Sequence, residues 1–322
     1  MIKNTFIVAL ALLLAPLTTS GQFVIRDNRT QETKIADLLA QMPATDQAYL
    51  NTLMTTMADL GEEALVSMAG MLTPSGIGND ASVRYAMGGF SKFVSGPGQE
   101  KNRLLCEKAW CHALDAANEP EVQSFLITQI QQVGTDLSIP FLEKYLTKPG
   151  LSDPASRALA TINSPEAGRA LLNALNKAQP AEQLSLVEAM RNMGYTEALG
   201  GITPLASSQD PKMKKVALFA LAKIGSPSSA SLMHEAALKS GFTYEPVQAT
   251  ASYLAWIGRL AGNGNKALAE KHCISLINTC TAKNQTQTRS AALSMLALSS
   301  PEKVTPSLYN ALKSNNRPYW MT

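Results

Sequence analysis

The sequence predicts an all-α fold, an α-solenoid of about seven to eight antiparallel helical hairpins. Three observations support this prediction. Apolar residues recur at helical spacing along most of the 322 residues, prolines and small residues mark helix starts and ends, and the turns repeat at intervals near 31 residues. No stretch after the first 21 residues shows the pattern of a β-strand.

The composition agrees with helical packing and excludes several classes of protein. Hydrophobic residues make up 45% of the chain, which is ordinary for a folded protein and excludes disorder. Aromatic residues make up 6%, too few for an aromatic-rich β-sandwich. The formal net charge of +3 is too small to indicate a nucleic-acid partner, so we expect none.

Residues 1–21 have the pattern of a signal peptide. Lys3 supplies the positive charge, residues 6–15 form a short apolar run, and small residues at 19–21 precede Gln22. The run has about ten residues, against the ~20 needed to cross a bilayer, and no later stretch is long and apolar enough. We therefore expect cleavage after Gly21 and a periplasmic or secreted product that does not span the membrane. A retained anchor is the alternative.

Residues 22–118 are expected to form irregular helical hairpins. Leu60 and Gly61 separate two amphipathic segments, TDQAYLNTLMTTMADL and EEALVSMAGML. A second and longer pair of helices is expected over residues 80–94 and 100–117, with glycine-containing loops at 75–79 and 95–99.

Residues 119–316 are expected to form regular repeats, followed by a polar tail at 317–322 that contains Tyr319 and Trp320. Proline marks the helix starts, because its fixed φ and missing N–H are favourable at the first helical position. The pairs at these starts are Glu119–Pro120, Asp153–Pro154, Ser164–Pro165, Gln179–Pro180, Asp210–Pro211, Ser226–Pro227, Glu245–Pro246 and Ser300–Pro301.

The turns between these helices recur almost periodically. They fall at Val133–Gly134, Ile162–Asn163, Met193–Gly194, Ile224–Gly225 and Ile257–Gly258, with a looser one at Ser299–Ser300. The intervals between the first five are 29, 31, 31 and 33 residues. Glycine or asparagine at these positions predicts a left-handed helix C-cap. One helical pair per unit at this period is the signature of a solenoid.

These units resemble the HEAT-repeat family in its short bacterial type. The segments PKMKKVALFALAKIGSPSSASLMHEAAL and EQLSLVEAMRNMGYTEALGGITPLA carry the resemblance, which covers residues ~119–316 well and ~30–118 loosely. The chain also resembles the N-terminal helical region of exported Bacteroidetes-type proteins that continue into a 3-keto-disaccharide hydrolase-type domain. The resemblance implies a helical module, or a truncated form of a longer protein, since we recognise no such domain here.

The four cysteines are expected to be free thiols. Cys106 and Cys111 lie five residues apart, and Cys273 and Cys280 lie seven apart, in helical stretches. Seven helical residues span about 10.5 Å, whereas a disulfide requires Cα atoms within roughly 7 Å. The spacing does not match a structural zinc site either. The adjacent His112 and His272 leave a metal site as the minor alternative.

No catalytic, cofactor or metal site is predicted. His112, His234 and His272 are dispersed over different repeats, and general acid–base chemistry needs such groups in one place. Ser300 and Lys303 match S-x-x-K but stand at an interhelical turn, so we interpret Ser300 as a helix cap. First-turn carboxylates are explained by the helix dipole; these are Glu62, Glu63, Glu166 and Glu302.

Two sets of residues could instead contact a ligand. Exported carbohydrate binders stack sugars on exposed aromatic rings, and the candidates are Trp110, Tyr195, Tyr253 and Trp256, although each lies in or beside an amphipathic helix and is expected to pack in the core. The lysines at 212, 214 and 215 are expected to be solvated, with an anionic partner as the alternative.

The sequence as a whole favours a non-catalytic, exported interaction scaffold that binds a protein partner or presents an attached domain. The first alternative is an accessory module or fragment of a glycan-processing enzyme, which the family resemblance alone suggests. The second alternative is direct binding of a small ligand or carbohydrate on a concave aromatic patch. The identity of the partner does not follow from the sequence.

Overall fold

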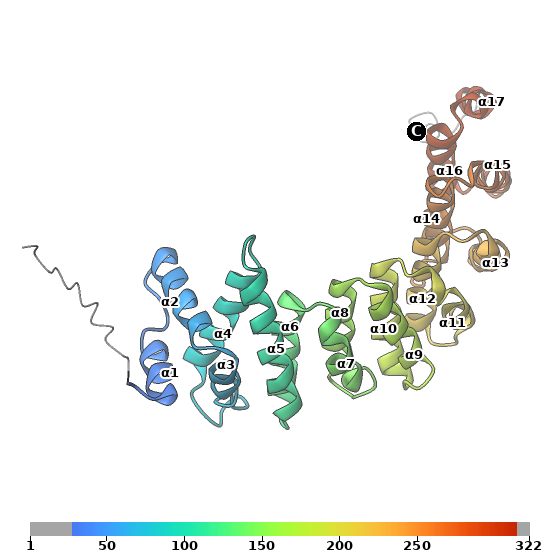
Figure 1. Cartoon of the computed structure of the whole chain (residues 1–322). Coiled ribbons are helices and arrows are strands. Elements are labelled where there is room, and N and C mark those ends of the chain that lie inside the picture. Colours follow the sequence, from blue (N-terminus) through green and yellow to red (C-terminus); the bar gives the residue numbers. More distant parts are fainter. Residues whose placement is uncertain (1–27, 314–322) are drawn as a thin grey trace, which may run out of the picture.

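The computed structural model describes residues 28–313, and this part of the chain consists of helices and connecting turns without a β-strand. The predicted all-α, solenoid-like fold is therefore confirmed. The predicted signal peptide and the tail at 317–322 lie outside the described residues. Figure 1 shows an elongated array in which successive helices are stacked side by side.

The helices form two rows, because alternate helices along the chain stack on one another. The inner row consists of α2 (Gln47–Asp59), α4 (Ala81–Val94), α6 (Pro120–Val133), α8 (Ser152–Ile162), α10 (Pro180–Met193), α12 (Pro211–Ile224), α14 (Ala249–Gly262) and α16 (Thr286–Ser299). The outer row consists of α1 (Gln31–Leu39), α3 (Glu62–Ala69), α5 (Glu100–Ala116), α7 (Ile139–Leu142), α9 (Pro165–Leu175), α11 (Leu199–Ile202), α13 (Ala230–Lys239), α15 (Lys266–Ala282) and α17 (Pro301–Leu312).

Pairing each inner helix with the outer helix that follows it gives eight hairpins over the described residues, with α1 before them. Short 3₁₀ turns flank or start several outer helices: η1 (Asp136–Ser138), η2 (Glu143–Tyr145), η3 (Thr196–Ala198), η4 (Thr203–Ser207) and η5 (Pro227–Ser229). This count agrees with the predicted seven to eight hairpins.

The core is a continuous apolar layer between the two rows. In α10, for example, Leu186 and Met190 are fully buried, and Leu159 of α8 and Leu221 of α12 are fully buried beside them. A single hairpin could not cover these faces, so each unit depends on its neighbours for hydrophobic stabilisation.

Most of the predicted helix starts are confirmed. The Ser164 hydroxyl accepts from the Ala167 N–H at 3.1 Å, and the Asp210 carboxylate accepts from the Lys212 N–H at 3.0 Å, as N-caps should. Two starts were wrong. Helix α8 begins at Ser152, two residues before its proline, and α14 begins at Ala249. The Glu245 carboxylate instead accepts from the Val247 N–H in the turn and from the Ala249 N–H at the start of α14, at 2.6 Å each.

The predicted left-handed caps are confirmed at three of five turns and wrong at two. Asn163, Gly194 and Gly225 have φ of 55°, 66° and 64°. Gly134 has φ −60°, and a Cβ there would meet the Ile130 carbonyl oxygen at 2.8 Å, so close approach explains its glycine. Gly258 lies inside α14, whose chain turns only after Gly262.

The array of helices bends at α12. Figure 1 shows the helices up to α10 following one direction and those from α12 onward turning away, with the inner row on the inside of the bend. The connection between α13 and α14 is long, since it spans residues 240–248. Gly241, Phe242 and Gln248 have positive φ in this connection, of 68°, 60° and 58°.

Gly194→Ala and Gly225→Ala form a matched pair that separates backbone strain from crowding. A Cβ at Gly194 would meet nothing, so only the left-handed φ opposes it, and we expect a loss of about 1 kcal/mol. A Cβ at Gly225 would overlap Arg259 Cγ and lie 2.9 Å from its Cβ. We expect the Gly225 variant to lose about 2–4 kcal/mol. Equal losses in denaturant unfolding would contradict this account of the α12–α14 contact.

Candidate functional site

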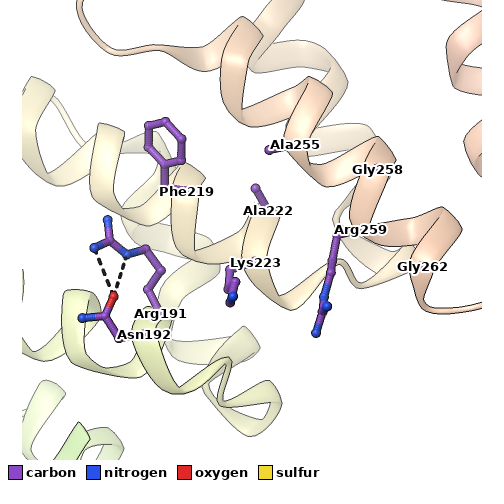
Figure 2. Close-up of a pocket in the computed structure, with 9 residues that line it drawn as sticks. All are labelled: Arg191, Asn192, Phe219, Ala222, Lys223, Ala255, Gly258, Arg259 and Gly262. Carbon is purple, nitrogen blue, oxygen red and sulfur yellow. Dashed lines mark hydrogen bonds between the residues drawn. The ribbon is translucent and has the colours of Figure 1, made fainter. Parts of the chain in front are cut away.

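A groove of about 610 Å³ lies on the inside of the bend, where α10, α12 and α14 stack on one another. Figure 2 shows the side chains that line it, all of them from these three inner-row helices. The lining residues are Arg191, Asn192, Phe219, Ala222, Lys223, Ala255, Gly258, Arg259 and Gly262. We call this hollow the elbow groove.

Three cations line the elbow groove, and each comes from the last turn of a different helix. Arg191 is on α10, Lys223 on α12 and Arg259 on α14. The Arg191 guanidinium donates twice to the Asn192 amide oxygen, at 3.4 and 3.2 Å. No carboxylate lines the groove, and within the described chain none lies within 4.0 Å of these three cations.

The rest of the lining is small or apolar. Ala255, Gly258 and Gly262 are exposed, Ala222 is buried, and the half-buried Phe219 lies on α12 (Figure 2). The absent side chain at Gly258 also lets α16 approach, since a Cβ there would lie 3.0 Å from Met295 Cε. The groove therefore combines an apolar surface with a positive potential that no groove-lining carboxylate offsets.

Charge is distributed unequally along the whole array. Residues 28–163 contain 15 Asp and Glu and 10 Lys and Arg, a formal net charge of −5. Residues 164–313 contain 9 acidic and 15 basic residues, a formal net charge of +6. The elbow groove lies in the basic half. The formal net charge of +3 for the whole chain does not reveal this asymmetry.

The aromatic residues considered as sugar-stacking candidates pack mostly in the core. Trp110, Tyr253 and Trp256 are fully buried, so the core interpretation is confirmed for these three. Each indole N–H has a partner, the Ser91 hydroxyl for Trp110 and the Ser226 carbonyl for Trp256, both at 3.0 Å. Tyr195 is half-buried and covers Gly168. The alternative that these residues stack sugars on exposed rings is therefore wrong for Trp110, Tyr253 and Trp256.

The structure brings together two histidines that the sequence analysis had treated as dispersed. The rings of His234 and His272 lie 6.5 Å apart, and the His272 Nδ1 is 2.6 Å from the Tyr253 hydroxyl. Burial raises the pKa of Tyr253, so its hydroxyl is protonated and donates to Nδ1. Burial, with smaller contributions from His234 and Lys271, lowers the pKa of His272 below 6.5. Tyr253 and His272 therefore form a hydrogen-bonded pair, and the His234 ring packs against both of them.

His272 is expected to make the stability of the folded chain depend on pH. Since its folded pKa is below its unfolded value of 6.5, the unfolded state binds more protons between these two pKa values. The free energy of unfolding should therefore fall as the pH decreases through about 6.5 toward the lowered pKa. His272→Gln should flatten this dependence between about pH 7.5 and about pH 5.5. Denaturant unfolding at several pH values measures it, and an unchanged slope would contradict it.

The cysteines are free and buried, as predicted. Burial is the main cause that raises each thiol pKa, to about 12 for Cys111 and about 11 for Cys273 and Cys280. A raised pKa leaves little thiolate at neutral pH, so these sulfurs are poor nucleophiles and poor metal ligands. Within residues 28–313, no group of three or more His, Cys, Asp or Glu is arranged to hold a metal ion.

Of the remaining candidates, Ser300, Lys303 and His112 each lie beside a carboxylate. The Ser300 hydroxyl donates to Glu270 at 3.2 Å, and the Lys303 ammonium lies 4.0 Å from the same carboxylate. His112 Nδ1 lies 2.8 Å from Glu62, which is in the first turn of α3. The lysines at 212, 214 and 215 lie near the start of α12 and do not line the elbow groove.

Comparison with known proteins identifies no family. No family model matches the chain, and no curated protein matches it. One similar solved structure is a crystal structure of an engineered protein from the Northeast Structural Genomics Consortium, with 20% identity, a TM-score of 0.31, and coverage of 69% of this chain and 94% of that one. A likeness of this degree carries no argument.

The fold and the groove therefore define the class of protein directly: an all-α, solenoid-like array with a basic groove on the inside of its bend. None of the helices described in residues 28–313 combines the length and the apolar character needed to cross a bilayer.

Proposed function

We propose that this chain is an exported, HEAT-like interaction scaffold that binds a protein partner along the inside of its bend. The observation that carries the proposal is the elbow groove, which three successive inner-row helices form together. A surface built from several repeats suits an extended partner, because each unit contributes one or two contacts.

The proposal favours binding over catalysis. The buried cysteines have raised thiol pKa values, and the half-buried His272, whose pKa is lowered by burial, accepts a hydrogen bond from the Tyr253 hydroxyl. The elbow groove offers cations and apolar atoms but no group suited to act as a general base at neutral pH. We expect the purified chain to show no turnover of disaccharides or 3-keto sugars. Measurable turnover by the purified chain would favour the glycan-processing alternative.

Site-specific cross-linking in the cells that produce the protein tests the scaffold proposal. A photo-reactive amino acid replaces Ala255, which is exposed in the elbow groove, and in a matched variant it replaces Leu238, which is 44% exposed on the outer helix α13. We expect one defined protein to be cross-linked from position 255 and not from 238, and to bind saturably when both proteins are purified. Equal cross-linking from both positions, or none, would overturn the proposal.

Export is tested separately by N-terminal sequencing of the protein recovered from the periplasm or medium. A mature chain that begins at Gln22 is expected, because the small residues at 19–21 end the predicted signal peptide. A product that retains Met1 would contradict it.

A further inference from the structure

We propose that the elbow groove binds an acidic segment of the partner protein, in which carboxylates meet Arg191, Lys223 and Arg259 and an apolar side chain packs against Phe219. This inference rests on the proposed scaffold function and specifies the chemistry of the segment that the groove takes.

Three cations line one groove. Cations near helix C-termini stabilise their own helices through the helix dipole, and this would account for each of the three separately. It does not account for their meeting in one groove without an acidic residue in the lining. A partner carboxylate would take up donors that have no ion-pair partner within the described residues.

Arg191, Lys223 and Arg259 come from successive helices of one row, so their spacing follows the stacking of the repeats (Figure 2). An extended or helical peptide that crosses the inner row can place successive carboxylates at successive cations.

Part of the groove lining is apolar. Phe219 is half-buried, and the neighbouring Ala222 and Ala255 add only methyl groups. Space beside an accessible ring admits one apolar side chain, which gives a binding energy that salt does not screen. The basic half of the array, with a net charge of +6, supplies a further attraction of longer range.

Fluorescence anisotropy with the purified full chain tests the inference. The probe is a short labelled peptide rich in Asp and Glu with one Phe, and its control is the same peptide with Asn and Gln in place of the acids. We expect saturable binding of the acidic peptide alone. Combining Arg191→Gln, Lys223→Gln and Arg259→Gln should weaken it by at least roughly tenfold. The matched control combines Lys212→Gln, Lys266→Gln and Lys271→Gln, which removes the same charge outside the groove and should weaken binding by less than about threefold.

Phe219→Ala gives an independent readout. It should weaken binding of the peptide with Phe and leave binding of an acidic peptide with Ala in that position unchanged, so a general loss of folding would be recognised. Circular dichroism checks that each variant keeps its helix content.

Three outcomes would overturn the inference. One is equal weakening by the two triple variants, which would show diffuse attraction. Another is binding of single-stranded DNA through the same three cations as tightly as the acidic peptide. The third is absence of peptide binding. If the partner is still cross-linked from position 255 in that last case, the scaffold proposal stands and only the acidic chemistry fails.

Discussion

Replacing Glu107 by alanine is expected to lower the free energy of unfolding by about 3–5 kcal/mol. This carboxylate is fully buried on α5 and accepts from the Thr135 N–H at 2.6 Å, the Thr135 hydroxyl at 2.9 Å and the Ser138 hydroxyl at 2.7 Å. Without it, the Thr135 donors at the start of η1 lose their acceptor, and so does the hydroxyl of Ser138, which is fully buried. The same helix holds the preceding turn, because Arg103 donates to the Val133 carbonyl at 2.7 Å.

Two further variants make this expectation specific. Glu107→Gln keeps one acceptor oxygen and should lose clearly less than the alanine variant. Glu119→Ala removes an exposed carboxylate that makes no side-chain cap bond at the start of α6, so the change should stay within about 0.5 kcal/mol. Urea unfolding followed by circular dichroism measures all three. A loss for Glu107→Ala as small as that for Glu119→Ala would refute the assigned role.

Trp256→Ala is expected to cost about 3–5 kcal/mol, the second large effect. The indole is fully buried in α14, stacks on the Tyr253 ring at 5.9 Å, and donates to the Ser226 carbonyl at 3.0 Å. Its removal leaves a cavity where α14 packs on the turn that follows α12. Because repeats contact mainly their neighbours, we expect faster amide hydrogen exchange in α12–α15 and little change in α3–α6.

The control variants divide this effect into parts. Trp256→Phe restores most of the buried area without the N–H and should cost about 1–2 kcal/mol. Tyr244→Ala removes an aromatic side chain that is 52% exposed in the connection before α14, and it should change stability by less than about 0.5 kcal/mol. Uniform acceleration of exchange along the whole array would contradict the local account.

Much of the fold was predictable because its signals are local. The pairs Ser164–Pro165 and Asp210–Pro211 act within one helical turn. The side chains of Ser164 and Asp210 cap the helices that begin at the following proline. Gly258 was misassigned to a turn because its glycine serves a contact with Met295 of α16, which lies far along the chain. A local pattern cannot distinguish a glycine that ends a helix from one that admits a neighbouring helix.

The elbow groove was not predictable for a similar reason. Phe242 and Gln248 adopt left-handed conformations in the connection 240–248, and neither residue type signals this. Each groove cation taken singly is ordinary at a helix end. Aligning the repeats on the predicted turns would not have grouped them, because Arg191 and Lys223 precede Gly194 and Gly225 whereas Arg259 follows Gly258. The pairing of His234 with His272 depended on the same connection.

The unequal distribution of acidic and basic residues gives the array a large permanent electric dipole moment along its length. With net charges of −5 and +6 on its two halves, the molecule experiences a torque in the field of a charged partner before the surfaces touch. An acidic approaching protein would turn the basic half, and with it the elbow groove, toward itself. At physiological ionic strength the Debye length is about 8 Å, so this orientation operates during the final approach and weakens as salt is added. The rate of encounter, more than the lifetime of the complex, should therefore carry the salt dependence.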